Sequence, residues 1–423
     1  MNHYSVAIVG GGQAGLSMSY CLKERGIHHI IFEKHEVGYA WRSKRWDAFC
    51  LVTPNWQCRL PGYPYPGNDP HGFMRKDEIV NYVKSYATVF DPPLKEGVEV
   101  ASVRKTEANQ FELTTSIGTF TADQIVIAVG GYHLPKVPRI AERLPESIAQ
   151  IHSSEYKNSQ LLPAGEILVV GTGQSGCQIA EDLHLAGRKV HLSVGSAPRS
   201  PRRYRGKDVV DWLDQMGYYD LSIEEHPQKE KVRAKANHYL TGRDGGREID
   251  LRQFALEGMQ LYGRLKSIGS EKLEFGSDLQ QNLDQADAVA ESIKRTIDSF
   301  IEKNNISAPV EQPYRPVWQP DEAKTECETA NISAVVWCTG YKSDFSWIEI
   351  PVFDGKGYPG HDRGVTPISG LYFLGLPWLH TWGSGRFSGI ASDASYLADY
   401  IVARTKVSSA NAWSVVNEFL LGS

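Results

Sequence analysis

Ile8-Val9-Gly10-Gly11-Gly12-Gln13-Ala14-Gly15, close to the start of the 423-residue chain, joins an apolar run to a glycine-rich turn. Residues 6–9 predict a buried strand, and a helical pattern follows the turn. In such a Gly-x-Gly-x-x-Gly turn, Gly10 allows the tight bend, Gly12 lets the backbone approach a pyrophosphate, and Gly15 lets the helix pack on the strand. Free N–H groups at the helix N-terminus favour phosphate, so this order predicts a dinucleotide site.

An acidic residue stands at the expected distance from this turn. The apolar run 30–32 ends at Glu33, about 20 residues on, where a carboxylate accepts hydrogen bonds from ribose hydroxyls. A glycine-rich turn alone is a weak signal, because such turns are common. With its strand, helix and acid in place, the stretch favours dinucleotide binding over a plain turn.

The second half of the chain repeats this order. A strand predicted over 166–170 leads into Gly171-Thr172-Gly173-Gln174-Ser175-Gly176, then a helical pattern and a strand that ends at Ser193. Ser193 stands at the position that Glu33 has in the first unit. A carboxylate there would repel a 2′-phosphate, whereas a serine could donate to one, and a basic loop follows, which favours NADPH over NADH. A solvated loop without a ligand is the alternative. The candidate phosphate ligands, among which the sequence does not choose, are Arg199, Arg202 and Arg203.

The composition is that of a soluble, globular chain. Hydrophobic residues make up 41% and charged residues 22% of it, and its length predicts two domains. The net charge of −5 gives no reason to expect nucleic acid or an anionic membrane as a partner. No apolar run is as long as a membrane span, and the first strand begins at once, which leaves no room for a signal peptide. We therefore expect a cytoplasmic protein.

Three further segments bear on a site. Residues 41–67 are dense in aromatic, proline and glycine residues, as expected of a rigid surface loop or of a wall around a flat cofactor. A long helix is predicted from 279 to 301, with an apolar stripe for core or dimer packing. Glycines at 383–389 precede a last helix, whose free N-terminus suits an anionic or carbonyl oxygen.

Taken together, these features resemble the class B flavin-dependent monooxygenases, which include the flavin-containing monooxygenases and the Baeyer–Villiger enzymes. The matching elements are the two glycine turns, Trp41-Arg42, Thr339-Gly340-Tyr341 and the sequence His-Ser-Ser-Glu-Tyr at 152–156. The chain departs from the family's signature at Glu146 and Ile148, where Phe and Gly are usual. The resemblance implies an α/β fold with two Rossmann-like dinucleotide-binding domains, the NADPH domain inserted in the FAD domain.

The same resemblance assigns domains and cofactor residues. Residues 1–155 would form the first part of the FAD-binding domain, 160–333 the NADPH-binding domain with a helical insertion, and 334–423 the return segment with the C-terminal helix. The residues expected to bind FAD are Gly10, Gly12, Ala14, Gly15, Glu33, Trp41 and Arg42, with Ser388, Gly389 and Ile390 at the flavin pyrimidine edge. The resemblance places NADPH on Gly171, Gly173, Gln174, Ser175 and Gly176. Ser193 and the three arginines join them because no acid stands at the end of the second strand.

The reaction of the family implies roles for few side chains. NADPH reduces FAD, the reduced flavin takes up O2 as a C4a-peroxide, and one oxygen atom passes to a small organic substrate by N-, S- or carbon oxygenation. Asn55 and Gln57 are the candidate catalytic residues, as hydrogen-bond partners of the peroxide, although a polar residue beside a proline is more often a turn former. No metal ion is expected.

Three other functions fit the same motifs. A flavin-dependent NADPH oxidase or reductase without oxygen transfer shares every cofactor motif. A flavin disulfide reductase needs a redox pair of thiols; Cys50 and Cys58 are too far apart for a Cys-x-x-Cys motif, though not necessarily in space. A non-catalytic nucleotide-binding sensor is disfavoured by two complete glycine turns.

The long helix also offers a face for a homodimer.

Overall fold

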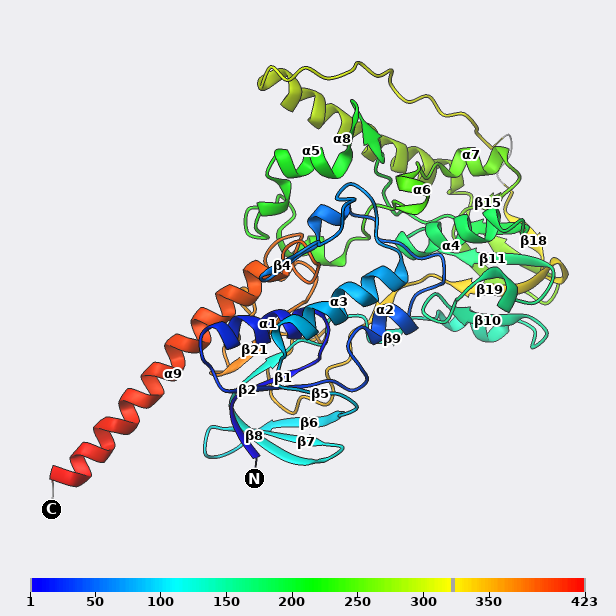
Figure 1. Cartoon of the computed structure of the whole chain (residues 1–423). Helices are drawn as coiled ribbons and strands as arrows, with labels where there is room; N and C mark the ends of the chain where they lie inside the picture. Colours follow the sequence, from blue (N-terminus) through cyan, green and yellow to red (C-terminus); the bar gives the residue numbers. More distant parts are fainter. Residues whose placement is uncertain (1, 321–323, 422–423) are drawn as a thin grey trace.

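The computed structural model describes residues 2–320 and 324–421 of the chain (Figure 1). A mostly parallel sheet of seven strands forms the first domain. In spatial order its strands are β5 (Leu94–Lys95), β2 (His29–Phe32), β1 (Asn2–Val9), β8 (Gly118–Ile127), β7 (Phe111–Thr115) and β6 (Val100–Lys105), and β21 (Leu371–Phe373) also pairs with β8. Because β1 is parallel to β2 and to β8, the carboxyl ends of these strands meet at one edge.

Both faces of this sheet are covered, which explains why the carboxyl-terminal parts of its central strands, residues 6–9 and 125–127, are apolar on both faces. One face carries the helices α1 (Gln13–Glu24), α3 (Lys76–Phe90) and α9 (Ile390–Leu421). Val6 and Ile8 of β1 pack with these helices. Ala7 and Val9 point to the opposite face. There they pack with side chains of β6 and β7, at the far end of the same sheet, and of residues 345–352.

The second domain repeats this plan around a parallel sheet of five strands. In spatial order they are β10 (Ala149–His152), β19 (Ile332–Trp337), β11 (Glu166–Val170), β12 (Val190–Ser193) and β15 (Gln260–Tyr262). One face packs against α4 (Gln174–Leu185), α7 (Leu251–Leu256) and α8 (Leu279–Lys303). The other packs against η2 (Arg139–Arg143) and a small sheet of β16 (Leu265–Ile268), β17 (Lys272–Phe275) and β18 (Glu326–Glu328). Two Rossmann-like domains confirm the predicted fold class.

The domain borders differ from those predicted at 155 and 333. β10 and β19 both belong to the second sheet, where β19 lies between β10 and β11. β19, expected in the return segment, stands to β11 as β8 stands to β1: Val170 pairs with Trp337 as Val9 pairs with Ile127. An apolar strand has the same pattern whichever sheet it joins, so the sequence alone does not reveal this placement.

The chain crosses between the domains twice, and the two crossings lie side by side. β9 (Leu134–Pro135) and β20 (Tyr341–Lys342) form a two-stranded antiparallel ribbon. Next to it the Lys136 N–H donates to the Gly340 carbonyl at 2.9 Å, and His152 Nε2 lies 3.0 Å from the same oxygen. His152 therefore helps to hold the crossing together.

Two excursions from the sheets bring the domains into contact. The first contains α2 (Tyr39–Ser43), η1 (Asn55–Gln57), β3 (Arg59–Leu60) and β4 (Tyr63–Pro64). The second contains β13 (Arg203–Tyr204), β14 (Lys207–Asp208), α5 (Val209–Gln215), η4 (Tyr218–Asp220), η5 (Lys229–Ala234) and α6 (Arg243–Gly246). They meet where Trp56 Nε1 donates to Asp211 Oδ1 at 2.8 Å and Arg202 donates to the Val52 carbonyl at 2.7 Å. In Figure 1 part of the first excursion, drawn in blue, lies between α5 and α3.

The long helix α8 confirms the predicted stripe and explains it by packing within the chain. Leu283 and Ala286 pack against the second sheet, and Ile297 and Ile301 pack against α5. The stripe is thus core rather than a free dimer face. In the part of the chain that the structure describes, no helix combines the length and apolar character needed to cross a bilayer.

Candidate dinucleotide-binding site

The glycines of the first turn serve two different purposes. Gly10 has φ +105°, and a Cβ added there would lie 2.7 Å from the Ala128 carbonyl oxygen. A Cβ on Gly15 would lie 1.8 Å from the Gly10 oxygen, so packing requires both glycines. Gly12 has an ordinary extended backbone, φ −75° and ψ −174°, and a Cβ there would meet no atom within 4 Å. The fold does not require glycine at this position, and the open space leaves room for a ligand to approach the backbone.

The second turn reproduces this geometry. Gly171 has φ +103° and a Cβ there would lie 2.8 Å from the Cys338 carbonyl oxygen, while one on Gly176 would lie 1.9 Å from the Gly171 oxygen. Gly173, with φ −63° and ψ 179°, again has open space around its missing Cβ. Neither α1 nor α4 has a side-chain cap at its N-terminus. Both turns therefore offer free N–H groups and an uncrowded approach, as a pyrophosphate requires.

A glutamine opens the helix after each turn and fastens a returning loop. Gln13 Nε2 donates to the Gly385 carbonyl at 3.1 Å. Gln174 bonds both backbone groups of Leu240: its Nε2 donates to the oxygen, and its Oε1 accepts from the N–H at 3.2 Å. Gln174, predicted to contact NADPH, instead holds the loop that contains Leu240. Gln13 was not among the predicted site residues, although a glutamine at the same position in both turns indicates a shared role.

Glu33 lies where the prediction put it, against the first turn. Its Oε2 accepts from the Gly11 N–H at 2.6 Å and its Oε1 from the His35 N–H at 2.9 Å. These bonds hold the carboxylate at the carboxyl end of β2, beside the turn. Of the next two predicted contacts, Trp41 stacks on Phe387 with ring centroids 5.5 Å apart. Arg42 is exposed and forms an ion pair with Glu36.

The segment before α9 also carries an unpartnered polar atom. Ser388 Oγ is buried and has no hydrogen-bond partner among the described residues. Its neighbour Gly389 lies against Gly383, with only 2.6 Å between a Cβ added at Gly389 and the Gly383 carbonyl carbon, so this glycine is required by packing. Ile390, also predicted to contact the flavin, is fully buried in the core of the first domain. Ser388 is therefore the residue of this group that fits a ligand.

The two predicted catalytic residues have opposite environments. Asn55 is satisfied: its Nδ2 donates to the Asp69 carbonyl at 3.0 Å and its Oδ1 accepts from the Met74 N–H at 2.7 Å. Asn55 thus holds its own segment to residues 69–74 of the same loop. Gln57 is 1% exposed, and neither its amide nitrogen nor its amide oxygen has a partner among the described residues. Leaving such groups unpaired costs about 1–3 kcal/mol each, so the amide is available to hydrogen-bond a ligand.

Gln57 and Ser388 belong to neighbouring segments. Two residues after Gln57, the Arg59 N–H donates to the Phe387 carbonyl at 3.2 Å. The two unpartnered side chains thus flank one backbone contact, and Phe387 also stacks on Trp41. A flat polar group with donors and acceptors on its edge, as the flavin ring has, fits this set of residues.

The predicted 2′-phosphate contact Ser193 is not free. Its hydroxyl donates to the Gly263 carbonyl at 3.1 Å and accepts from the Leu265 N–H at 3.0 Å. The residue is buried and ties β12 to the segment after β15. The end of β12 carries no carboxylate, as predicted. The Ser193 hydroxyl, however, already donates its hydrogen to Gly263 and has none left for a phosphate.

Two of the three predicted arginines are also structural. Arg199 is buried 3.3 Å from Asp287 and 3.5 Å from Asp250, and the acids outweigh burial so that its pKa is raised. Arg202 is buried against Asp208. Arg203 alone is exposed, donating to the Gly245 carbonyl at 3.1 Å. The acidic partners of Arg199 and Arg202 lie between 6 and 88 residues further along the chain. The sequence of the loop alone therefore does not show that these two arginines are already paired.

Comparison with known proteins assigns the family. Residues 7–255, more than half of the chain, match the pyridine nucleotide-disulphide oxidoreductase family. The chain belongs to that family. A CzcO-like oxidoreductase of Geobacillus kaustophilus, itself uncharacterised, is 34% identical over 404 residues, which cover 94% of this chain and 98% of that protein.

Solved structures of this fold include both monooxygenases and disulfide reductases. A flavin-containing monooxygenase from Stenotrophomonas maltophilia superposes with a TM-score of 0.65 at 16% identity, covering 96% of this chain and 100% of that one. A bacillithiol disulfide reductase from Bacillus cereus gives 0.62 at 15% identity, covering 95% and 100%. The expected resemblance to the flavin-dependent monooxygenases is confirmed, and the fold by itself does not choose between the two reactions.

The cysteines argue against a disulfide reductase within this oxidoreductase family. All six are free thiols. Burial raises the pKa of Cys50 to about 11 and that of Cys58 to about 12. Redox-active thiols need a lowered pKa, because the thiolate is the reacting form. Cys50 and Cys58 behave instead as small core residues.

This leads to a labelling prediction. At pH 8 a thiol of pKa about 11 is ionised in only about one molecule in a thousand, so a disulfide reagent should modify Cys50 and Cys58 at least about a hundredfold more slowly in the native protein than in urea. Thiols are counted by absorbance, with and without NADPH. Two thiols that become reactive only after NADPH is added would instead reveal a redox pair.

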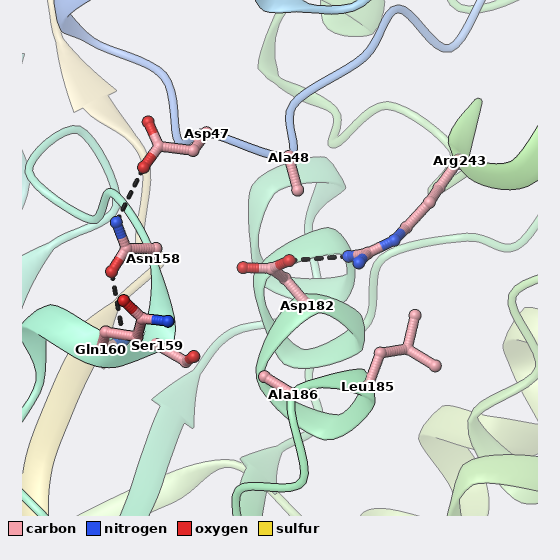
Figure 2. Close-up of a pocket in the computed structure, with 9 residues that line it drawn as sticks. All are labelled: Asp47, Ala48, Asn158, Ser159, Gln160, Asp182, Leu185, Ala186 and Arg243. Atoms are coloured by element: carbon pink, nitrogen blue, oxygen red, sulfur yellow. Dashed lines mark hydrogen bonds and ion pairs between the residues drawn. The ribbon is translucent and has the colours of Figure 1, made fainter.

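A cavity of about 250 Å³ lies beside the C-terminal end of α4, away from the glycine turn (Figure 2). Its charged side chains are already paired: Arg243 donates to Asp182 Oδ1 at 2.6 Å, and Asn158 donates to Asp47 Oδ2 at 2.7 Å. Asp182 lies about 12 Å along the helix from Gln174. We assign no ligand to this cavity.

Proposed function

We propose that this chain is an FAD- and NADPH-dependent monooxygenase, which transfers one oxygen atom of O2 to a small organic substrate. Two glycine turns of matching geometry support the binding of two dinucleotides, because at Gly12 and Gly173 the fold does not require glycine and the backbone is open to a ligand. The buried thiols oppose the competing disulfide chemistry. Bound FAD would accept a hydride from NADPH and react with O2.

The protein residues would bind, orient and shield. The N-terminus of α1 would hold the FAD pyrophosphate, with Glu33 beside it for a ribose. Gln57 and Ser388 would hydrogen-bond the edge of the flavin ring, while Trp41 and the loops around it exclude water. The turn at Gly173 would hold the second dinucleotide, and the lack of a carboxylate at the end of β12 favours NADPH over NADH.

Gln57→Leu should leave the fold intact and weaken flavin binding. Leucine is similar in size and removes two buried polar atoms that have no partner, so the free energy of unfolding should stay level or rise. Loss of one hydrogen bond of about 1 kcal/mol should raise the dissociation constant of FAD about fivefold. Urea unfolding and flavin titration measure the two effects.

Asn55→Ala is the matched control for this variant. It removes the bonds to Asp69 and Met74, which should cost about 2 kcal/mol of stability, while the folded fraction keeps its affinity for FAD. If Gln57→Leu unfolds as readily as Asn55→Ala, or binds FAD as tightly as the native protein, Gln57 does not face the cofactor.

An oxygen balance tests the reaction itself. NADPH consumed, O2 consumed and H2O2 released are measured on the flavin-bound protein while amines, thioethers, ketones and carboxylic acids are added one at a time. A monooxygenase should lower the H2O2 released per NADPH with at least one of these classes. A constant ratio of one H2O2 per NADPH with every compound would instead identify an NADPH oxidase.

A further inference from the structure

Arg386 lies in the loop before α9, where residues 223–237 of the second domain, here called the covering segment, contact that loop. Its guanidinium donates to the Trp382 carbonyl and, at 3.0 Å, to Asn237 Oδ1 of the second excursion. It also lies 4.1 Å from the centroid of the Trp382 ring. The covering segment is fastened by the Ile223 N–H, which donates to the His380 carbonyl at 2.7 Å. Arg386 thus lies between the two domains.

This guanidinium has no acidic partner among the described residues. All its hydrogen bonds go to neutral oxygens, and burial lowers its pKa, with only tyrosines as nearby ionisable groups. The arginines whose side chains are at most 3% exposed each have carboxylates: Arg199 and Arg252 share Asp287, and Arg202 has Asp208. Arg386 is half-buried, and no carboxylate of the described residues neutralises its charge. Its guanidinium is therefore available to an anion.

The side chains around Arg386 indicate which kind of anion would bind there. Trp382 is partly exposed, and the Tyr219 ring packs beside it with centroids 4.7 Å apart. Two aromatic side chains next to an unpaired guanidinium suit a flat apolar group attached to a carboxylate. Trp378, by contrast, is buried with Ile223 and belongs to the core.

A phosphate of either dinucleotide is another candidate for this charge, because Gln13 at the start of α1 bonds Gly385 and Gln174 at the start of α4 bonds Leu240. The two aromatic side chains beside the guanidinium favour an organic acid over a phosphate. Arg45 also lacks an acidic partner among the described residues, and burial lowers its pKa. It lies over the rings of Trp41 and Phe49, among predicted flavin contacts, which makes a cofactor phosphate the simpler partner for Arg45.

We propose that Arg386 binds the carboxylate of the substrate, so that the substrate of the proposed monooxygenase is an organic acid with a flat apolar group. This inference rests on the proposed function for its meaning. The binding site itself does not depend on turnover, and it can be tested on the resting, flavin-bound protein.

The test compares phenylacetate with its neutral isostere phenylacetamide. Binding is followed through tryptophan fluorescence and flavin absorbance. Native protein should bind phenylacetate at least about tenfold more tightly than phenylacetamide. Arg386→Met should abolish this preference and leave the affinity for phenylacetamide unchanged, and Arg386→Lys should retain part of it.

Arg233→Met is the matched control. Arg233 Nε donates to the Trp378 carbonyl at 3.1 Å and its charge is paired with Glu230, so its loss affects the same covering segment without removing an unpaired cation. The carboxylate preference should survive in this variant. If it is lost in both variants alike, the segment is merely structural and the proposal is overturned.

Other outcomes also count against the proposal. Equal affinity for the two probes, or binding of neither at millimolar concentration, would overturn it. So would an Arg386→Met protein that keeps the preference but binds FAD or NADPH less tightly, because the anion would then belong to a cofactor. Flavin content and NADPH oxidation are recorded on the same preparation: a protein without flavin refutes the proposed function, whereas one that oxidises NADPH without preferring the acid refutes this inference alone.

Discussion

Gly12→Ala should give a folded protein that has lost most of its affinity for flavin. The added methyl group meets no protein atom within 4 Å, and the backbone at Gly12 is one that alanine adopts readily. The free energy of unfolding should therefore stay level or rise by up to about 1 kcal/mol. The same methyl group would keep a pyrophosphate from the backbone, and the dissociation constant of FAD should rise at least about tenfold.

The matched control is Gly15→Ala, the same chemical change three residues later. There the methyl group would lie 1.8 Å from the Gly10 oxygen, so we expect a loss of about 3 kcal/mol or more in stability. Urea unfolding and flavin titration separate the two effects. A Gly12→Ala protein that retains native affinity for FAD would show that no ligand approaches this turn.

Gly173→Ala should separate the two dinucleotides. The variant should keep its flavin and its stability, since the added methyl group has open space, but NADPH should reduce the flavin at least about tenfold more slowly at subsaturating concentration. Dithionite, which needs no binding site, should reduce the flavin as fast as in the native protein. Anaerobic stopped-flow absorbance measures both rates.

Gly176→Ala is the structural counterpart in this turn, because its methyl group would lie 1.9 Å from the Gly171 oxygen. It should lower the stability of the second domain. If Gly173→Ala instead loses flavin, or is reduced by NADPH at the native rate, the second turn does not hold NADPH.

The features that the sequence predicted well are local ones. The two glycine turns, their strands and Glu33 depend on residues within one strand–turn–helix unit, and the structure places them as expected. The long helix α8 was also predictable, because its stripe follows the period of a helix. In each case neighbours in sequence are neighbours in space.

The errors concern partners that are distant in sequence. β19 joins the second sheet by pairing with β11, where Trp337 lies opposite Val170, a residue 167 positions earlier in the chain. The sequence pattern of β19 gives no sign of this pairing. Arg199 looked like a phosphate ligand because Asp250 and Asp287, which neutralise it, come much later. Pattern alone does not reveal which charges are already paired.

Asn55 and Gln57 illustrate the same limit within one short segment. Both are buried amide side chains two residues apart, and the sequence offers no basis for choosing between them. The choice depends on backbone groups of Asp69 and Met74, which satisfy Asn55 and leave Gln57 without a partner. Only the three-dimensional path of the loop shows which amide is available to a ligand.

The central claim is that flavin reduced by NADPH in this protein activates O2 for transfer. The most direct measurement mixes the NADPH-reduced protein with oxygenated buffer and records flavin absorbance over time. We predict a lasting absorbance that differs from both reduced and oxidised flavin and decays slowly with release of H2O2 when no substrate is present. Immediate return to oxidised flavin with stoichiometric H2O2, or a protein that holds no flavin, would contradict the account.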